Sequence, residues 1–238
     1  MAKPRVRLRP EIEDLPSYVP GARGRGAMQE KLSSNENPYP PLPRVVAAVA
    51  DAAEDLNRYP ELRSERLQAA LAESLCLSED HLVMGNGSIA VLETLLDALC
   101  SAGDEVVHAW RSFEAYPIAI AVAGARSVPV PLLADGRHDV EAIASAVTER
   151  TRAVLLCSPN NPTGPALTQA EVEYVLEHVP DNVAVVVDEA YVEFVRMQDV
   201  VNSLELLTQD PRVVVLRTFS KAYGLAALRV GYAAARPR

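Results

Sequence analysis

Short and almost continuous apolar runs alternate with stretches of helical spacing along most of the chain. Because most of these runs lack apolar–polar alternation, we expect strands buried on both faces of a mostly parallel sheet. The runs predict strands at residues 81–85, 105–110, 127–132, 153–158, 183–188 and 213–218. The helical spacing predicts helices at residues 43–56, 64–75, 88–101, 139–149 and 168–178. Alternating strands and helices indicate an α/β fold in which helices flank the sheet.

The pattern before residue 43 is different, because proline and glycine cluster there. The strings SYVPGARGRGAM and NENPYPPLP are rich in turn-forming residues and predict an extended arm. We therefore expect an N-terminal arm at residues 1–42 and one domain at residues 43–238.

Composition narrows the class of protein. Of the 238 residues, 49% are apolar and 23% are charged, which is typical of a globular domain with a sizeable core. The net charge of −9 would repel a phosphate backbone, so we expect no nucleic-acid partner and an anion site only where the chain builds one locally. Three cysteines form no disulfide framework, and no apolar run predicts a membrane span or a signal peptide. We expect a cytoplasmic protein.

Polar strings follow four of the predicted strands. They are GNGS (85–88), SPNNPTG (158–164), DEAY (188–191) and TFSKAYG (218–224). Ligands of open parallel sheets bind beyond the carboxyl ends of the strands, so these strings are the candidates for chemistry. Together they offer a lysine amine, a carboxylate, an asparagine and a tyrosine.

Several familiar sites can be excluded. Gly85, Gly87 and Ala90 match a dinucleotide fingerprint. The acidic candidates Asp104 and Glu105 stand at the start of the next strand, however, whereas the ribose needs an acidic residue after that strand. No GxxxxGK[ST] loop accompanies VAVVVDE, which argues against a nucleotide hydrolase. The four histidines lack metal-ligand spacing, so we predict no metal site, and the S-x-x-K arrangement of Ser-Lys hydrolases is absent around Lys221.

The remaining groups suit pyridoxal phosphate. This cofactor needs a lysine amine to bond with, a carboxylate to keep its ring nitrogen protonated, donors for its ring oxygen and an anion pocket for its phosphate. The polar strings contain a candidate for each need, and Arg229 follows shortly afterwards. The sequence therefore predicts pyridoxal 5'-phosphate as the cofactor.

Five strings also resemble the fold-type I aminotransferases, and within them the histidinol-phosphate aminotransferase group. They are KLSSNENPYP, NRYPE, CSPNNPTG, VVVDEAYVEF and TFSKAYGLAALRVGY, spread over residues 31–233. RPEIEDLPSYVPG and AWRSFEAYP look most like the aromatic amino acid (phenylalanine-type) branch. Histidinol-phosphate enzymes typically continue GNGS with acidic residues, where this chain has Ile89 and Ala90.

The resemblance implies an activity and a set of catalytic residues. The expected reaction transfers the amino group of an aromatic L-amino acid to 2-oxoglutarate, with histidinol phosphate open as an alternative substrate. Lys221 matches the lysine that bonds with the cofactor and moves a proton, and Asp188 matches the carboxylate at the ring nitrogen. Tyr191 and Asn161 match the donors to the ring oxygen.

Another set of residues is expected to hold the phosphate. Gly87 and Ser88 lie where a strand enters a helix, so free backbone N–H groups and the helix dipole can bind an anion there. Thr218, Ser220 and Arg229 resemble the family's other phosphate contacts, and Arg229 supplies the fixed charge.

The resemblance also implies contacts around the cofactor and across a dimer. Phe113 aligns with the aromatic residue that stacks on the cofactor ring. Tyr59 matches a tyrosine that reaches the cofactor phosphate of a neighbouring subunit, so we expect a homodimer. Tyr18 and the segment from Asn35 to Asn37 are expected to line the substrate entrance.

The chain departs from the family in length. Family members carry the arginine for the substrate carboxylate in a C-terminal small domain, and this sequence stops at Arg238. We therefore expect the large domain of a fold-type I enzyme with the small domain missing, and weak transamination by residues 1–238 alone. A truncated domain that binds cofactor or dimerises without catalysis stays open as an alternative.

Overall fold

A seven-stranded sheet forms the centre of the protein. The structure is a computed structural model that describes residues 9–13, 15 and 34–237, so the predicted substrate residue Tyr18 lies outside the described residues. The strand order is β1-β7-β6-β5-β4-β2-β3, and β7 is the one described strand that runs against the others. The strands are β1 (Leu82–Gly85), β2 (Glu105–Trp110), β3 (Arg126–Pro131), β4 (Thr151–Cys157), β5 (Ala184–Asp188), β6 (Val213–Thr218) and β7 (Gly231–Ala235).

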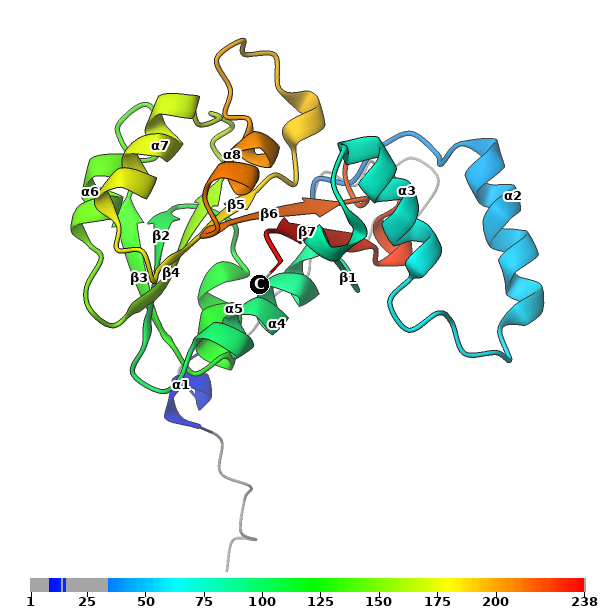
Figure 1. Cartoon of the computed structure of the whole chain (residues 1–238), viewed down its shortest axis with the longest axis horizontal. Helices are drawn as coiled ribbons and strands as arrows, with labels where there is room; N and C mark the ends of the chain where they lie inside the picture. The colour runs from blue at the N-terminus through cyan, green and yellow to red at the C-terminus, as the bar shows by residue number, and fades with distance from the viewer. Residues whose placement is uncertain (1–8, 14, 16–33, 238) are drawn as a thin grey trace, which may run out of the picture.

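Helices cover both faces of this sheet. Figure 1 shows α6, α7 and α8 over one face and α4 and α5 over the other. The α-helices are α1 (Pro10–Glu13), α2 (Pro43–Ala52), α3 (Glu65–Leu75), α4 (Ser88–Leu99), α5 (Tyr116–Val122), α6 (Val140–Ser145), α7 (Gln169–His178) and α8 (Ser203–Gln209). Short 3-10 turns lie at Ala53–Asp55, Glu79–His81, Val192–Phe194 and Ala226–Leu228.

The core consists of two apolar layers, one on each side of the sheet. Side chains alternate between the faces of a strand, so Val185 and Val187 of β5 pack in the layer under α7 and α8, whereas Val186 packs in the layer under α4 and α5. All three valines are almost fully buried. Burial on both faces explains why these strands appear in the sequence as continuous apolar runs.

The predicted α/β fold with a mostly parallel sheet is confirmed, and six of the seven described strands match the predicted runs within two residues. Strand β7 was not predicted, because the residues of its sequence GYAAA are too small and too weakly apolar to stand out. Its small residues suit a strand that packs closely against α4, since a Cβ at Gly231 would clash with the backbone of Gly87 and Ser88.

The helix predictions need more correction. The predicted helix 139–149 ends at Ser145, and the predicted helix 43–56 continues beyond Ala52 only as a 3-10 turn. Helices α5 and α8 were missed, because each has seven residues and too few turns to show a period. The arm is not wholly extended, since α1 forms one helical turn within it.

Two segments flank the sheet without joining its core. Helix α2 contains no buried residue and projects away from the sheet at the side of β1 (Figure 1). The segment before it runs back to the sheet, where Asn37 Nδ2 donates to the carbonyl oxygen of Ala222 at 3.1 Å. In the described part of the chain, no helix combines the length and apolar character needed to cross a membrane.

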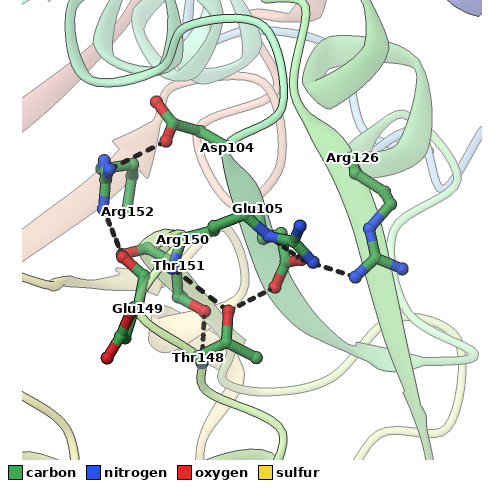
Figure 2. Close-up of polar contacts among 8 residues, drawn as sticks. All are labelled: Asp104, Glu105, Arg126, Thr148, Glu149, Arg150, Thr151 and Arg152. Carbon is green, nitrogen blue, oxygen red and sulfur yellow. Dashed lines mark hydrogen bonds and ion pairs between the residues drawn. The ribbon is translucent and has the colours of Figure 1, made fainter.

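The two ends of the parallel strands carry different groups. At the amino ends, β2, β3 and the turn before β4 bring Glu105, Arg126, Thr148 and Arg150 together in a polar cluster (Figure 2). At the carboxyl ends lie the polar strings singled out in the sequence. Binding groups and this charge cluster therefore occupy opposite edges of one sheet.

Candidate functional site

Four loops meet at the carboxyl edge of the sheet. They follow β1, β4, β5 and β6. Three of them hold the predicted residues Gly87, Asn161 and Lys221, and Asp188 ends β5 directly before the fourth. Strands β4, β5 and β6 are neighbours in the sheet, so their loops are adjacent although the sequence separates them by tens of residues. This is the edge at which parallel sheets bind their ligands.

Lys221 lies three residues beyond the end of β6, and its amine contacts the arm. Its Nζ donates to the carbonyl oxygens of Ser34 at 2.9 Å and Asn35 at 3.3 Å, and it lies 5.6 Å from the centre of the Tyr191 ring. Burial lowers the pKa of the Lys221 amine, and the nearby Arg229 charge acts in the same direction. A lysine with a lowered pKa loses its proton more readily and is a better nucleophile.

Asp188 ends β5 and is buried beneath the loops. Its Oδ2 accepts from the Tyr116 hydroxyl at 2.8 Å, and its Oδ1 accepts from the backbone N–H of Ala190 at 3.2 Å. Burial raises the pKa of this carboxyl, and the two hydrogen bonds oppose the rise by favouring the charged form. No guanidinium among the described residues pairs with it, so it is available to a positive charge on a ligand.

Tyr191 lies just beyond Asp188 and faces the arm. Its hydroxyl accepts from Asn35 Nδ2 at 3.0 Å, and burial raises its pKa above the ordinary tyrosine value. Asn161, from the loop after β4, lines an open pocket of about 500 Å³ together with Tyr191 and Asn35. The two predicted donors to the ring oxygen therefore border the same space.

The start of α4 provides an anion cradle. Gly87 precedes the helix with a φ of +89°, a backbone conformation that favours glycine. Within the described residues, nothing accepts from the backbone N–H groups of Ser88, Ile89 and Ala90. The Arg229 guanidinium lies directly against Gly87, where a Cβ would collide with it. Free N–H groups, the positive end of a helix and a guanidinium together suit a phosphate.

Thr218 and Ser220 lie next to this cradle at the end of β6. The Thr218 hydroxyl donates to the Ser220 hydroxyl at 3.0 Å and accepts from the Ser220 backbone N–H at 3.1 Å. Phe113 lies in the loop after β2 and packs edge to face on Tyr116, with ring centres 5.6 Å apart. Thr218 therefore ends β6, and Ser220 and Phe113 lie in the loops after β6 and β2, at the same edge of the sheet as Asp188.

Two predicted residues have other settings. Tyr59 is fully exposed and makes no described contact with the loops at the carboxyl edge. Asn37 bonds to the backbone of the lysine loop, since its Nδ2 donates to the carbonyls of Lys221 and Ala222. The two hydrogen bonds of Asn37 hold the arm beside Lys221.

Two buried polar residues of the site were not predicted from the sequence. Tyr116 donates to Asp188, and Asn160 joins two loops by accepting from Ser112 Oγ at 2.7 Å and donating to the Arg111 carbonyl at 3.1 Å. Both stand inside strings that were quoted, AWRSFEAYP and CSPNNPTG. A tyrosine three residues after Phe113 was the available signal for the first.

The histidines do not form a metal site in the described part of the chain, where no cluster of three metal-ligating side chains occurs. His108 is buried and contacts Ser127 and the Ala109 carbonyl. Glu189 is also buried, and it pairs with Arg217 at 2.7 Å, which supports a structural role.

Comparisons with known proteins point in the same direction. The family model for aminotransferase class I and II matches residues 27–238. Aromatic amino acid aminotransferases of Streptomyces coelicolor and Rhodococcus opacus are 50% and 52% identical to the chain, covering 99% and 96% of it. The chain spans 66% and 63% of the length of these two curated relatives.

A solved structure agrees with these relatives. The crystal structure of histidinol-phosphate aminotransferase from Sinorhizobium meliloti, in complex with pyridoxal-5'-phosphate, superimposes with a TM-score of 0.85. It is 30% identical and covers 98% of this chain, which in turn covers 64% of that chain. The family match extends over nearly all of the chain, and the fold agrees with it. The chain belongs to the class I and II aminotransferase family.

Proposed function

We propose that this chain forms the cofactor-binding part of a pyridoxal-phosphate-dependent aminotransferase that acts on aromatic L-amino acids. The amino group would pass to 2-oxoglutarate, giving an aromatic 2-oxo acid and L-glutamate. The observation that carries the proposal is the meeting of a buried carboxylate, an amine of lowered pKa and an anion cradle at one sheet edge. The names of the relatives at 50% and 52% identity support the aromatic substrate.

The residues present fit this cofactor. The unpaired N–H groups at the start of α4 and the Arg229 guanidinium would bind its phosphate, with the Thr218 and Ser220 hydroxyls beside them. Asp188 would pair with a positive charge at the ring nitrogen. That charge would offset the free-energy cost of burying the carboxylate. Phe113 would cover one face of the ring and exclude water from it.

When bound, the cofactor supplies an electron sink for the pair left at the substrate Cα as its proton departs. Lys221 would hold and return that proton at Nζ, since burial keeps its amine closer to neutral. The Tyr191 hydroxyl and the Asn161 amide would orient the ring oxygen. The cofactor-binding residues therefore divide into those that anchor the phosphate and those that tune the ring.

We also propose that the functional unit is a homodimer. Large apolar side chains are exposed along one stretch of the chain, among them Leu42, Leu56, Tyr59 and Leu62. Exposed apolar side chains that gather into a patch would mark an interaction site in a soluble protein. A second copy of the chain would cover it and would allow Tyr59 to reach the neighbouring cofactor phosphate.

The lysine content permits a sharp test of the cofactor site. The chain has three lysines, at positions 3, 31 and 221. Pyridoxal phosphate is added, the product is reduced with borohydride, and peptides are mapped by mass. We expect the adduct on Lys221, its retention in Lys31→Ala and its loss in Lys221→Ala. An adduct spread over all three lysines in a folded sample contradicts the proposal.

Substrate choice needs a second measurement. Transamination of phenylalanine, tyrosine and histidinol phosphate is compared with 2-oxoglutarate as the acceptor. We expect turnover with the two aromatic amino acids and a kcat/KM for histidinol phosphate at least tenfold lower. A preference for histidinol phosphate would instead assign the activity of the Sinorhizobium meliloti neighbour.

A further inference from the structure

Tyr116 contacts the Asp188 carboxylate from a fully buried position. It is the first residue of α5, and its side chain is 0% exposed. Its hydroxyl donates to Asp188 Oδ2 at 2.8 Å, whereas the backbone N–H of Ala190 donates to Oδ1 at 3.2 Å. Within the described residues, no other side chain donates to this carboxylate, so Tyr116 alone fixes the orientation of Oδ2.

The same ring supports Phe113. The two rings pack edge to face, with centres 5.6 Å apart and planes at 84°, and the Tyr116 backbone N–H donates to the Phe113 carbonyl at 3.0 Å. On another side the His108 ring packs against Tyr116 at 6.1 Å. A displaced Tyr116 side chain would therefore move both Phe113 and Asp188.

We propose that Tyr116 is a positioning residue of the cofactor site, which holds Asp188 in one orientation by a hydrogen bond and supports Phe113 by packing. This inference rests on the proposed function, because Asp188 and Phe113 are the residues assigned there to the ring nitrogen and the ring face. It adds a residue that touches neither the cofactor nor the substrate and acts through these two.

Electrostatics supports this role. Burial raises the pKa of Asp188 and so disfavours its charged form, whereas only the charged form can pair with a protonated ring nitrogen. A donor on Oδ2 stabilises the charged form and so opposes the rise in the Asp188 pKa. Burial and the Asp188 charge raise the pKa of Tyr116 well above its usual value, so its hydroxyl keeps the proton that it donates.

Tyr116→Phe removes one oxygen and keeps the ring that packs on Phe113. The matched control is Tyr174→Phe, because Tyr174 lies on α7, stacks on His178 and, as far as the described residues go, does not contact the site. Dissociation constants for pyridoxal phosphate are measured by equilibrium dialysis. We expect Tyr116→Phe to weaken binding about tenfold, which equals about 1.4 kcal/mol, and Tyr174→Phe to leave it unchanged.

A double-mutant cycle separates positioning from general stability. Asp188→Asn is made with and without Tyr116→Phe, and pyridoxal phosphate affinity is measured for all four proteins. If Tyr116 acts through the carboxylate, its substitution has much less effect once Asp188 is replaced. An equal effect in both backgrounds overturns the proposal, because Tyr116 would then contribute only packing.

A cofactor-free measurement completes the test. The Asp188 carboxyl is titrated by 13C NMR in the chain without cofactor, with Asp188→Asn to assign its signal. We expect the Asp188 pKa to rise by about one unit or more in Tyr116→Phe, and an unchanged pKa overturns the proposal. If the wild-type chain fails to bind pyridoxal phosphate, the proposed function fails, and this titration still decides whether Tyr116 controls Asp188.

Discussion

The charge cluster at the amino ends of the strands leads to a quantitative stability prediction. Glu105 opens β2 with its carboxylate shielded from water, and it accepts from Arg126 at 2.6 Å, from Thr148 at 2.7 Å and from Arg150 Nε at 3.0 Å (Figure 2). These bonds, led by the one from Arg126, lower the pKa of Glu105 from 4.5 to about 2. Glu105→Gln keeps the shape of the side chain and removes its charge.

The magnitude follows from linkage between protonation and folding. A shift of about 2.5 pKa units corresponds to about 3.4 kcal/mol at about 1.36 kcal/mol per unit. The side chains of Arg126 and Arg150, which pair with the carboxylate, are themselves 62% and 65% exposed. Solvent screens their charges, so the ion pairs contribute less to stability than this figure. We expect Glu105→Gln to lower the free energy of unfolding by about 1 to 2 kcal/mol at pH 7.

The sign of the pH dependence is fixed by the direction of the shift. Because folding depresses the Glu105 pKa, its stabilisation is fully present above the ordinary pKa of 4.5 and is lost as pH falls toward about 2. Glu105→Gln and the wild type should therefore differ most near neutral pH and converge in acid. Added salt should also reduce the difference.

Urea denaturation followed by far-UV circular dichroism measures this effect. Glu149→Gln is the matched control, because Glu149 lies in the same turn but its exposed side chain forms no ion pair among the described residues. A loss below about 0.5 kcal/mol for Glu105→Gln, or an equal loss for Glu149→Gln, would refute the reasoning. So would a difference that persists at pH 2.

Three further changes test the packing and capping of the fold. Gly231→Ala should destabilise the chain by about 1 to 3 kcal/mol in urea, because its Cβ would collide with the backbone of Ser88; an unchanged midpoint contradicts this close approach. Thr168→Ala should cost about 1 kcal/mol in the same assay, since it removes the capping box of α7. Iodoacetamide at pH 8 should alkylate exposed Cys76 well before Cys157, because burial raises the pKa of the Cys157 thiol to about 12. Mass spectrometry of the folded chain measures the order of alkylation, and equal rates at the two cysteines contradict the prediction.

The strands could be predicted from the sequence because burial on two faces leaves a strong trace. The run VAVVVD is continuous for this reason, and β5 occupies Ala184–Asp188 within it. Strand β7 left no such trace, because its role is to approach α4 closely and small residues serve that purpose. The short helices were not predicted for a different reason, because seven residues make fewer than two full turns and show no clear period.

Only those site residues that stand in recognisable local strings could be predicted from the sequence. Lys221, Asp188 and Arg229 each stand in a string after a strand, so the fold rule for parallel sheets brings them to one edge. The Tyr116–Asp188 contact spans 72 positions and depends on how α5 packs under the sheet, which no local pattern records. Asn35 likewise reaches Tyr191 from the arm across 156 positions.

The two edges of the sheet separate binding from stability. Parallel strands have all their amino ends at one edge of the sheet. The charged groups around Glu105, at the amino ends of β2, β3 and β4, therefore lie a full strand length from Asp188 and Lys221. Glu105→Gln should consequently weaken folding without changing the affinity of the folded chain for pyridoxal phosphate. Tyr116→Phe should lower that affinity, because its hydroxyl acts at the carboxyl edge. It should also lower the free energy of unfolding, because the buried Asp188 carboxylate loses a donor. Glu105→Gln should therefore change stability alone, whereas Tyr116→Phe should change both, and a loss of cofactor affinity in Glu105→Gln would contradict this separation of the two edges.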